Sequence, residues 1–198
     1  MFQKNFNLVQ AQVIAWKSEL SISALSFIFG VVTSVIFAIL FQINSKEILE
    51  TLTRSFEDIR ETALQENFLN IFLAIYQRNL TATAIIITSG LIFRYIPLTI
   101  VFLNGWILGI VFYSFTNLGA KIEQLISLLL PHGSFEIPAI ILAAALGMRL
   151  SRLGKGRGLK GRVVALINSW RAVALVAILL FIAGLIESSL IIFLRPHP

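Results

Sequence analysis

The sequence predicts an all-α integral membrane protein, a single domain over residues 1–198 built as a bundle of about five transmembrane helices. Hydrophobic residues make up 57% of the chain and charged residues only 13%, with a mean hydropathy of +0.87. A soluble domain of this size cannot cover so much apolar surface with so few charges. Long apolar segments recur along the chain, and basic residues cluster at their ends, as in multi-pass membrane proteins.

The first two predicted elements are an interfacial helix and a transmembrane helix. Apolar residues recur at steps of three and four through residues 2–18, with polar residues between them. This spacing is typical of an amphipathic helix lying flat in the membrane interface. The apolar segment 20–43 follows, and it is long enough to cross about 30 Å of hydrocarbon.

An acidic amphipathic helix is predicted over residues 46–66. Asn44 and Glu47 have the spacing of a capping box at its start. An acidic helix favours the outer surface over the anionic inner leaflet, and its apolar stripe needs a partner, which is the bilayer, the bundle or another protein. Six of the ten acidic residues of the chain lie in this segment: Glu47, Glu50, Glu57, Asp58, Glu61 and Glu66.

Four more transmembrane helices are predicted after this segment. Their ranges are 71–93, 97–117, 135–150 and 163–186. A short amphipathic helix is predicted over 121–130. Pro131–Gly133 is predicted to interrupt the helix before the fourth span. That break matters for function, because it frees backbone polar groups at the membrane surface.

The lysine and arginine distribution predicts the orientation. With the N-terminus inside, ten of these residues lie on the inner side and six on the outer side. The N-terminus is therefore predicted to be cytoplasmic and the C-terminus outside the cell membrane. A basic inner loop is predicted to contact anionic headgroups through Arg149, Arg152, Lys155, Arg157, Lys160 and Arg162.

Two glycine patterns have different interpretations. Gly156, Gly158 and Gly161 spell G-x-G-x-x-G, but no βαβ unit surrounds them, so the pattern predicts no dinucleotide site. Gly105 and Gly109 form G-x-x-x-G beside Asn104 in the third span. Small residues one turn apart let two helices approach closely, so this face is predicted to pack inside the bundle or to form a homodimer.

A polar cluster around the predicted break is the candidate functional site. Its residues are Asn79, Asn104, His132, Gly133, Glu136 and Glu187. Three interpretations stay open. Glu136 and His132 can fix the broken helix to its neighbours, the break can form a transport site, or the two residues can handle a metal or a proton.

Enzymatic chemistry is not expected. Cysteine is absent and only two histidines are present, which excludes disulfides and thiol catalysis. The chain has no G-x-S-x-G, H-E-x-x-H or Walker pattern. No catalytic residue, cofactor or resident metal is predicted, and no nucleic-acid partner is expected because the basic residues follow the ends of the apolar segments.

Several of these strings resemble a known family. They are P-H-G-S-F-E-I-P-A from Pro131, the alanine-rich run that ends at Gly147, N-G-x-x-x-G from Asn104, and A-G-L-I-E from Ala183. Together with Asn79, they are similar to motifs of the stage II sporulation protein M family, from about residue 68 onward.

The resemblance implies a multi-spanning membrane protein with no accepted enzymatic activity. The namesake of the family acts in spore formers as a membrane scaffold that recruits peptidoglycan-degrading proteins. The expected function is therefore a non-enzymatic scaffold with the lipid bilayer, envelope or membrane proteins and a second copy of the chain as partners. The alternative is a small transporter or permease subunit with its polar site at the broken helix.

Overall fold

The computed structural model describes residues 16–51, 67–153 and 158–193, and for 122–132 their backbone. Within these ranges every regular element is a helix and five helices are long and apolar enough to cross a membrane. The predicted all-α membrane bundle is confirmed. The long helices are α2 (Lys17–Leu40), α4 (Phe68–Ser89), α5 (Ile96–Asn117), α6 (Ile122–Leu153) and α8 (Trp170–Phe193), and the shorter α7 spans Gly158–Asn168.

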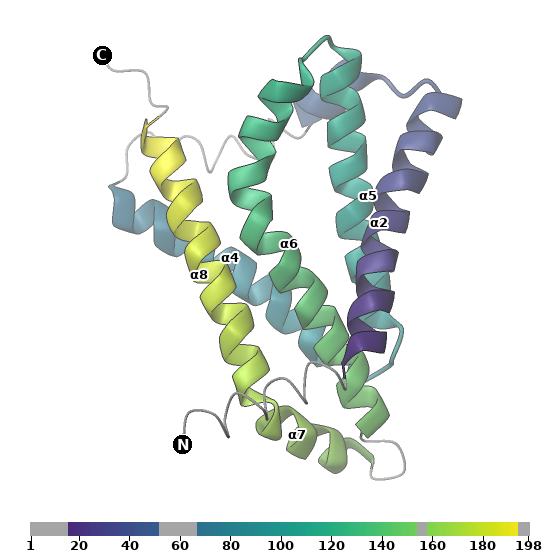
Figure 1. The fold of residues 1–198 in the computed structure, drawn as a ribbon, viewed down its shortest axis with the longest axis vertical. Helices are drawn as coiled ribbons and strands as arrows, with labels where there is room; N and C mark the ends of the chain where they lie inside the picture. The colour runs from purple at the N-terminus through teal and green to yellow at the C-terminus, as the bar shows by residue number, and fades with distance from the viewer. Residues whose placement is uncertain (1–15, 52–66, 154–157, 194–198) are drawn as a thin grey trace.

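The five long helices alternate in direction in a way that suits an odd number of crossings. Helices α2, α5 and α8 run from one end of the bundle to the other, and α4 and α6 return (Figure 1). Lys17 and Phe193 therefore lie at opposite ends of the bundle. The short helix α7 lies across the end at which α2 begins.

Helix α6 is the centre of the bundle. In its most apolar stretch 50% of the residues are buried, against 22–33% in the other four spans. Its small residues Ala139, Ala143, Ala144 and Gly147 allow neighbouring helices to approach closely. At the residue that caps the end of α4, a Cβ on Gly90 would overlap the backbone of Gly147.

Helices α2 and α5 form a parallel pair with direct backbone contact. A Cβ on Gly105 would overlap the carbonyl oxygen of Phe27, and one on Gly109 would overlap Ser34. On the α2 side, a Cβ on Gly30 would overlap the carbonyl oxygen of Phe102. These three glycines allow a helix separation that no other residue type permits.

The predicted break at Pro131–Gly133 is not observed. Helix α6 continues through these residues, so the segments predicted as 121–130 and 135–150 form one helix of 32 residues. Proline removes one hydrogen bond from the ladder, and membrane helices tolerate that loss when neighbouring groups satisfy the freed carbonyl. Glycine costs a helix only about 1 kcal/mol.

The last span begins later than predicted. The structure places α7 at Gly158–Asn168 and α8 at Trp170–Phe193, whereas the sequence predicted a span at 163–186. The predicted span ran through the polar residues Asn168, Ser169 and Arg171, and the structure places the boundary between the two helices at this interruption. Gly158, the first residue of α7, has φ +61°, in the left-handed region that favours glycine.

The other predicted elements differ in how far the structure describes them. The first, second and third spans are observed close to their predicted ranges. Of the acidic helix at 46–66, residues 45–51 are helical and 52–66 lie outside the described residues. The interfacial helix predicted at 2–18 lies almost wholly outside them.

Candidate functional site

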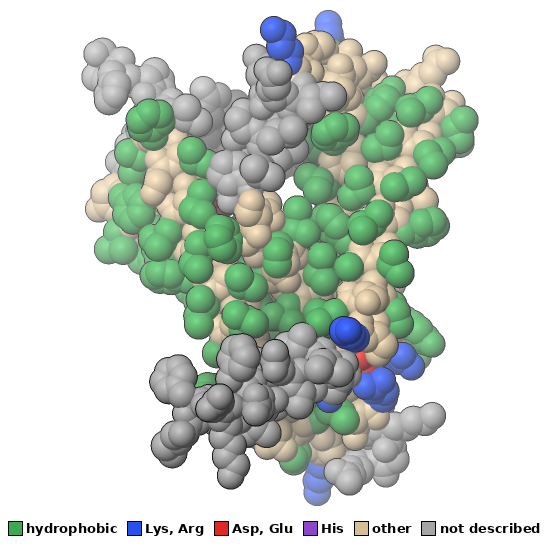
Figure 2. Space-filling model, viewed as in Figure 1, with side chains coloured by type: hydrophobic (Ala, Val, Ile, Leu, Met, Phe, Trp, Pro, Cys, Tyr) green, Lys and Arg blue, Asp and Glu red, His purple; other side chains and the backbone are tan. Residues whose placement is uncertain are grey.

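One end of the bundle carries most of the described basic side chains, and we call it the basic end. Figure 2 shows hydrophobic side chains over the middle of the molecule and Lys and Arg side chains gathered mainly towards its lower end. Of the described lysines and arginines, only Lys46, Arg78 and Lys121 belong elsewhere. Those at the basic end are Lys17, Arg94, Arg149, Arg152, Lys160, Arg162 and Arg171.

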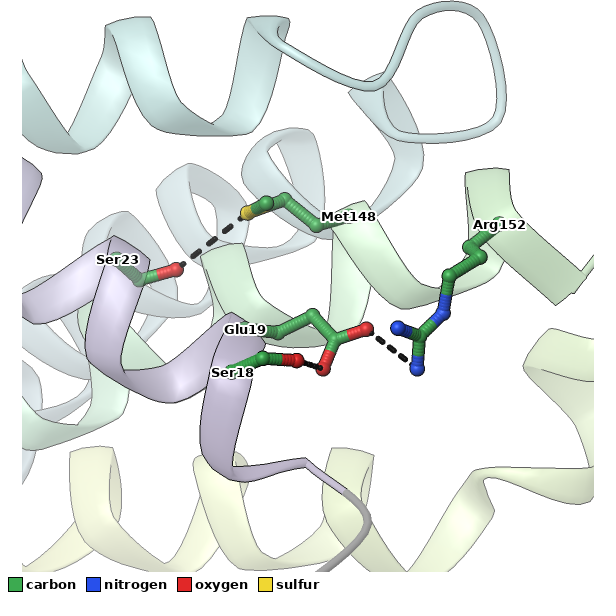
Figure 3. Close-up of polar contacts among 5 residues, drawn as sticks. All are labelled: Ser18, Glu19, Ser23, Met148 and Arg152. Carbon is green, nitrogen blue, oxygen red and sulfur yellow. Dashed lines mark hydrogen bonds and ion pairs between the residues drawn. The ribbon is translucent and has the colours of Figure 1, made fainter.

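A buried carboxylate joins α2 to α6 at the basic end. Glu19 is 1% exposed, and its Oε1 lies 2.7 Å from Nη2 of Arg152 (Figure 3). The contact is an ion pair without hydrogen-bond geometry, because Oε1 has no hydrogen-bond partner. The hydroxyl of Ser18 donates to Oε2 at 2.8 Å. A buried carboxylate needs such partners, since burying an unpaired charge is costly.

The same α2–α6 contact contains a weaker polar interaction one turn further along α2. The Ser23 hydroxyl lies 3.8 Å from Sδ of Met148, and both residues are buried (Figure 3). Glu19, Ser23 and Met148 therefore lie along one packed seam. The ion pair fixes this seam at its end, where Arg152 remains 46% exposed.

Arg162 holds α7 against the turn that follows α4. Its Nη1 donates to the carbonyl oxygens of Leu91 at 2.6 Å and Ile92 at 3.1 Å. These carbonyls lie just after the C-terminus of α4, where a helix leaves acceptors unsatisfied and favours a cation. Arg162 thus has a structural role that the predicted contact with headgroups did not include.

The predicted basic loop is mostly helical in the described residues. Arg149 and Arg152 belong to α6, whereas Lys160 and Arg162 belong to α7. Lys155 and Arg157 lie outside the described residues. Glu19 was missed as a site residue, although a signal existed: it is the single acidic residue before Glu47, next to an apolar segment and on the side predicted to be basic.

The G-x-x-x-G face is used inside the protomer. Gly105 and Gly109 contact α2, so the structure supports the packing interpretation, and a homodimer through these glycines would have to displace α2. The side-chain amide of Asn104 donates to the carbonyl oxygen of Ile100 in its own helix at 2.8 Å. This bond lies within α5 and does not cross the helix contact.

The predicted polar cluster is distributed over four helices. Asn79 lies on α4, Asn104 on α5, Gly133 and Glu136 on α6, and Glu187 on α8. Glu136 and Glu187 are half-buried, and neither carboxylate is without an interaction. The side chain of His132 lies outside the described residues. The functional importance of this cluster stays a prediction.

The packing of α4 on α8 separates two members of that cluster. Tyr76 and Phe72 stack edge-on against Phe181, at centroid distances of 5.8 and 5.1 Å. Because the start of α4 lies beside the end of α8, the two helices are antiparallel (Figure 1). Asn79 on α4 and Glu187 on α8 both come after this contact in sequence. Because the two helices are antiparallel, the two residues lie on opposite sides of the contact along the bundle.

Metal binding gains no support from the described side chains. Among them, no group of three or more His, Asp or Glu residues could hold a metal ion. The described side chains of the site make an ion pair, hydrogen bonds to backbone carbonyls and cation–π contacts.

Comparison with known proteins identifies a family. The family model described as Stage II sporulation protein M matches residues 23–190. An uncharacterized protein of Methanocaldococcus jannaschii is 34% identical over 151 residues, which cover 72% of this chain and 65% of that protein. The chain thus spans about 65% of the length of this relative. No solved structure matches the chain.

Proposed function

Because the chain belongs to the stage II sporulation protein M family, we propose that it is a non-enzymatic scaffold that presents a fixed surface to membrane or envelope proteins. The end of the bundle opposite the basic end, which we call the acidic end, is the surface that this proposal assigns to partners. The proposal takes its support from how that surface is attached to the bundle.

The start of the acidic helix is attached to the transmembrane bundle. Nδ2 of Asn117, at the end of α5, donates to the buried hydroxyl of Ser45 at 3.0 Å. Asn44 caps the same helix, because its Oδ1 accepts from the backbone N–H of Glu47 at 3.5 Å. These contacts anchor the first turn, while Glu47 and Glu50 remain exposed. A turn that is attached to the bundle and exposes two carboxylates suits protein recognition, and this observation carries the proposal.

The transporter alternative loses its main structural argument. A transport site was expected where a discontinuous helix exposes backbone groups, but α6 is continuous through Pro131 and Gly133. Asn104, a member of the predicted polar cluster, donates its side-chain amide to a backbone carbonyl of its own helix. The backbone contact of α2 with α5 also leaves no space between these two helices at Gly105.

The proposed orientation places the basic end in the cytoplasm and the acidic end outside. Seven of the ten described lysines and arginines lie at the basic end, and such an excess favours the inner side. The N-terminus is then cytoplasmic and the C-terminus outside. Self-association is also proposed, through a face other than Gly105 and Gly109.

The test combines crosslinking with a flux assay. A photo-crosslinking amino acid at Glu50 should capture envelope or membrane proteins in native membranes, whereas the same probe at Lys160 on the basic end should not capture them. Proteoliposomes containing the protein should show no solute flux above empty vesicles. Flux that is lost in Glu136→Gln without a change in melting temperature would contradict the scaffold and support the transporter.

A further inference from the structure

Helices α6, α7 and α8 meet at the basic end around an open pocket of about 290 Å³. Its polar lining comes from Arg149 near the end of α6, Asn168 at the end of α7, Ser169 between α7 and α8, and Arg171 in the first turn of α8. Trp16 and Val164 are among the residues that complete the wall. The described lining contains two arginines and no carboxylate, so its electrostatics favour an anion.

Aromatic rings position both arginines. The guanidinium carbon of Arg149 lies 5.1 Å from the ring centroid of Trp16, and that of Arg171 lies 5.6 Å from the ring centroid of Trp170. A cation–π contact restrains a guanidinium group, and the N–H fork of that group matches the geometry of a phosphate. The described acid Glu19 is paired with Arg152 at 2.7 Å and also acts electrostatically on Arg149, whereas it does not line the pocket.

The start of α8 adds to the positive potential of the pocket. This helix of 24 residues begins at Trp170, directly after the lining residue Ser169. The N-terminus of a helix carries partial positive charge and unsatisfied N–H groups. The last turns of α6 and α7 also line the pocket and carry the opposite partial charge, so the two arginines are the main groups that favour a negative ligand there.

The surroundings place the pocket at the depth of lipid headgroups. Tryptophan prefers the membrane–water interface, and Trp16 and Trp170 both lie beside the pocket arginines. Helix α7 exposes Leu159, Val164 and Ile167, an apolar face typical of a helix that lies in the interface. A ligand in this pocket can have a charged head among the arginines and an apolar part along α7.

We propose that this pocket binds the headgroup of an anionic phospholipid, with the phosphate between Arg149 and Arg171. The bound lipid holds α7 against the junction of α6 and α8, and its acyl chains extend along the apolar face of α7. This is a defined lipid site on one protomer, distinct from a general attraction of basic residues to the membrane surface.

The test measures lipid binding to the full chain in a neutral detergent. Native mass spectrometry should detect one tightly retained phosphatidylglycerol, and phosphatidylglycerol should raise the melting temperature more than phosphatidylcholine. Arg171→Gln should weaken retention about fivefold, the effect of one cationic side chain at a membrane surface. Lys160→Gln is the matched control, because Lys160 is exposed on α7 at the same end but does not line the pocket.

A second variant is needed in case Arg171→Gln destabilises the fold. If Arg171→Gln melts lower without lipid, Asn168→Asp introduces a carboxylate at an exposed lining position and should produce the same loss of retention. Three results would overturn the proposal: no preference for phosphatidylglycerol, an equal loss in Lys160→Gln, or equal protection by soluble glycerol phosphate. The third would assign the pocket to a free phosphate compound instead of a lipid.

Discussion

The middle and the basic end of this bundle are held together by opposite means. In the middle, α2 and α5 contact each other through glycines placed directly on carbonyl groups of the partner helix. At the basic end, the contacts are polar: Glu19 with Arg152, and Arg162 with the carbonyls of Leu91 and Ile92. Lipid tails do not drive apolar helices together, so close packing dominates where water is absent. An ion pair can join two helices where at least one partner reaches the interface and stays partly hydrated, as Arg152 does with 46% exposure.

The largest effect is expected in the middle. In Gly105→Ala, the new methyl group would overlap the Phe27 carbonyl oxygen, which belongs to the backbone and cannot rotate away. We expect a loss of about 3 kcal/mol of stability from this overpacking, measured by thermal unfolding in detergent. Gly184→Ala is the matched control, because its methyl group would meet a ring carbon of Phe72 at 3.3 Å and a small ring movement can accommodate it. Equal losses in both variants would show that backbone contact is not what makes the α2–α5 pair tight.

Removing either partner of the ion pair at the basic end should destabilise the protein, but by different amounts. Arg152→Gln leaves Glu19, which is 1% exposed, without its cation, and we expect a loss of about 2 kcal/mol, below the full cost of breaking a buried pair because the arginine is half exposed. Glu19→Gln leaves an arginine that water can reach and should cost about 1 kcal/mol. The two single variants and the double variant are compared by thermal unfolding. A greater loss in Glu19→Gln would contradict the assignment of the buried partner.

The Arg162 contact should contribute less. Arg162→Gln removes two charge-assisted hydrogen bonds to backbone carbonyls, and we expect a loss of about 1 kcal/mol, because water can replace them at this depth. Hydrogen exchange at residues 91–95 should increase in this variant. Lys160→Gln removes a neighbouring charge and should leave both measurements unchanged. Increased exchange in Lys160→Gln would mean that net charge, rather than the specific cap, holds this turn.

The smallest effect is expected at the acidic end. Ser45→Ala removes the acceptor for Asn117 and should cost about 0.5 kcal/mol. Its specific consequence is local, since hydrogen exchange at residues 46–51 should increase while that of α5 stays the same. Thr51→Ala is the control, because the Thr51 hydroxyl donates to the Glu47 carbonyl of its own helix at 2.8 Å. Equal increases would show that the acidic turn is not anchored by the bundle.

The sequence predicted the parts of this fold that depend on hydropathy alone. Three spans were found close to their ranges because Leu40, Ser89 and Asn117 are each followed within a few residues by polar or turn-forming residues. The Asn44 cap was also predicted, because capping depends on neighbours in sequence. The packing role of Gly105 and Gly109 was one of two stated interpretations, and only the structure shows that α2 is the partner.

Features that depend on contacts distant in sequence were not predicted. Whether Pro131 breaks a helix depends on what surrounds the freed carbonyl, and the sequence does not contain that information. The partnership of Glu19 with Arg152 joins residues 133 positions apart, and the charge of Glu19 alone could not identify its partner.

We propose that the five crossings place the basic end in the cytoplasm and the acidic end outside, and cysteine labelling tests this orientation most directly. Because the natural chain contains no cysteine, single cysteines can be introduced and labelled in intact cells with a membrane-impermeant maleimide. Glu47→Cys should be labelled in intact cells, and Lys160→Cys only after the cells are opened. Labelling of both positions in intact cells, or of neither, would contradict the account.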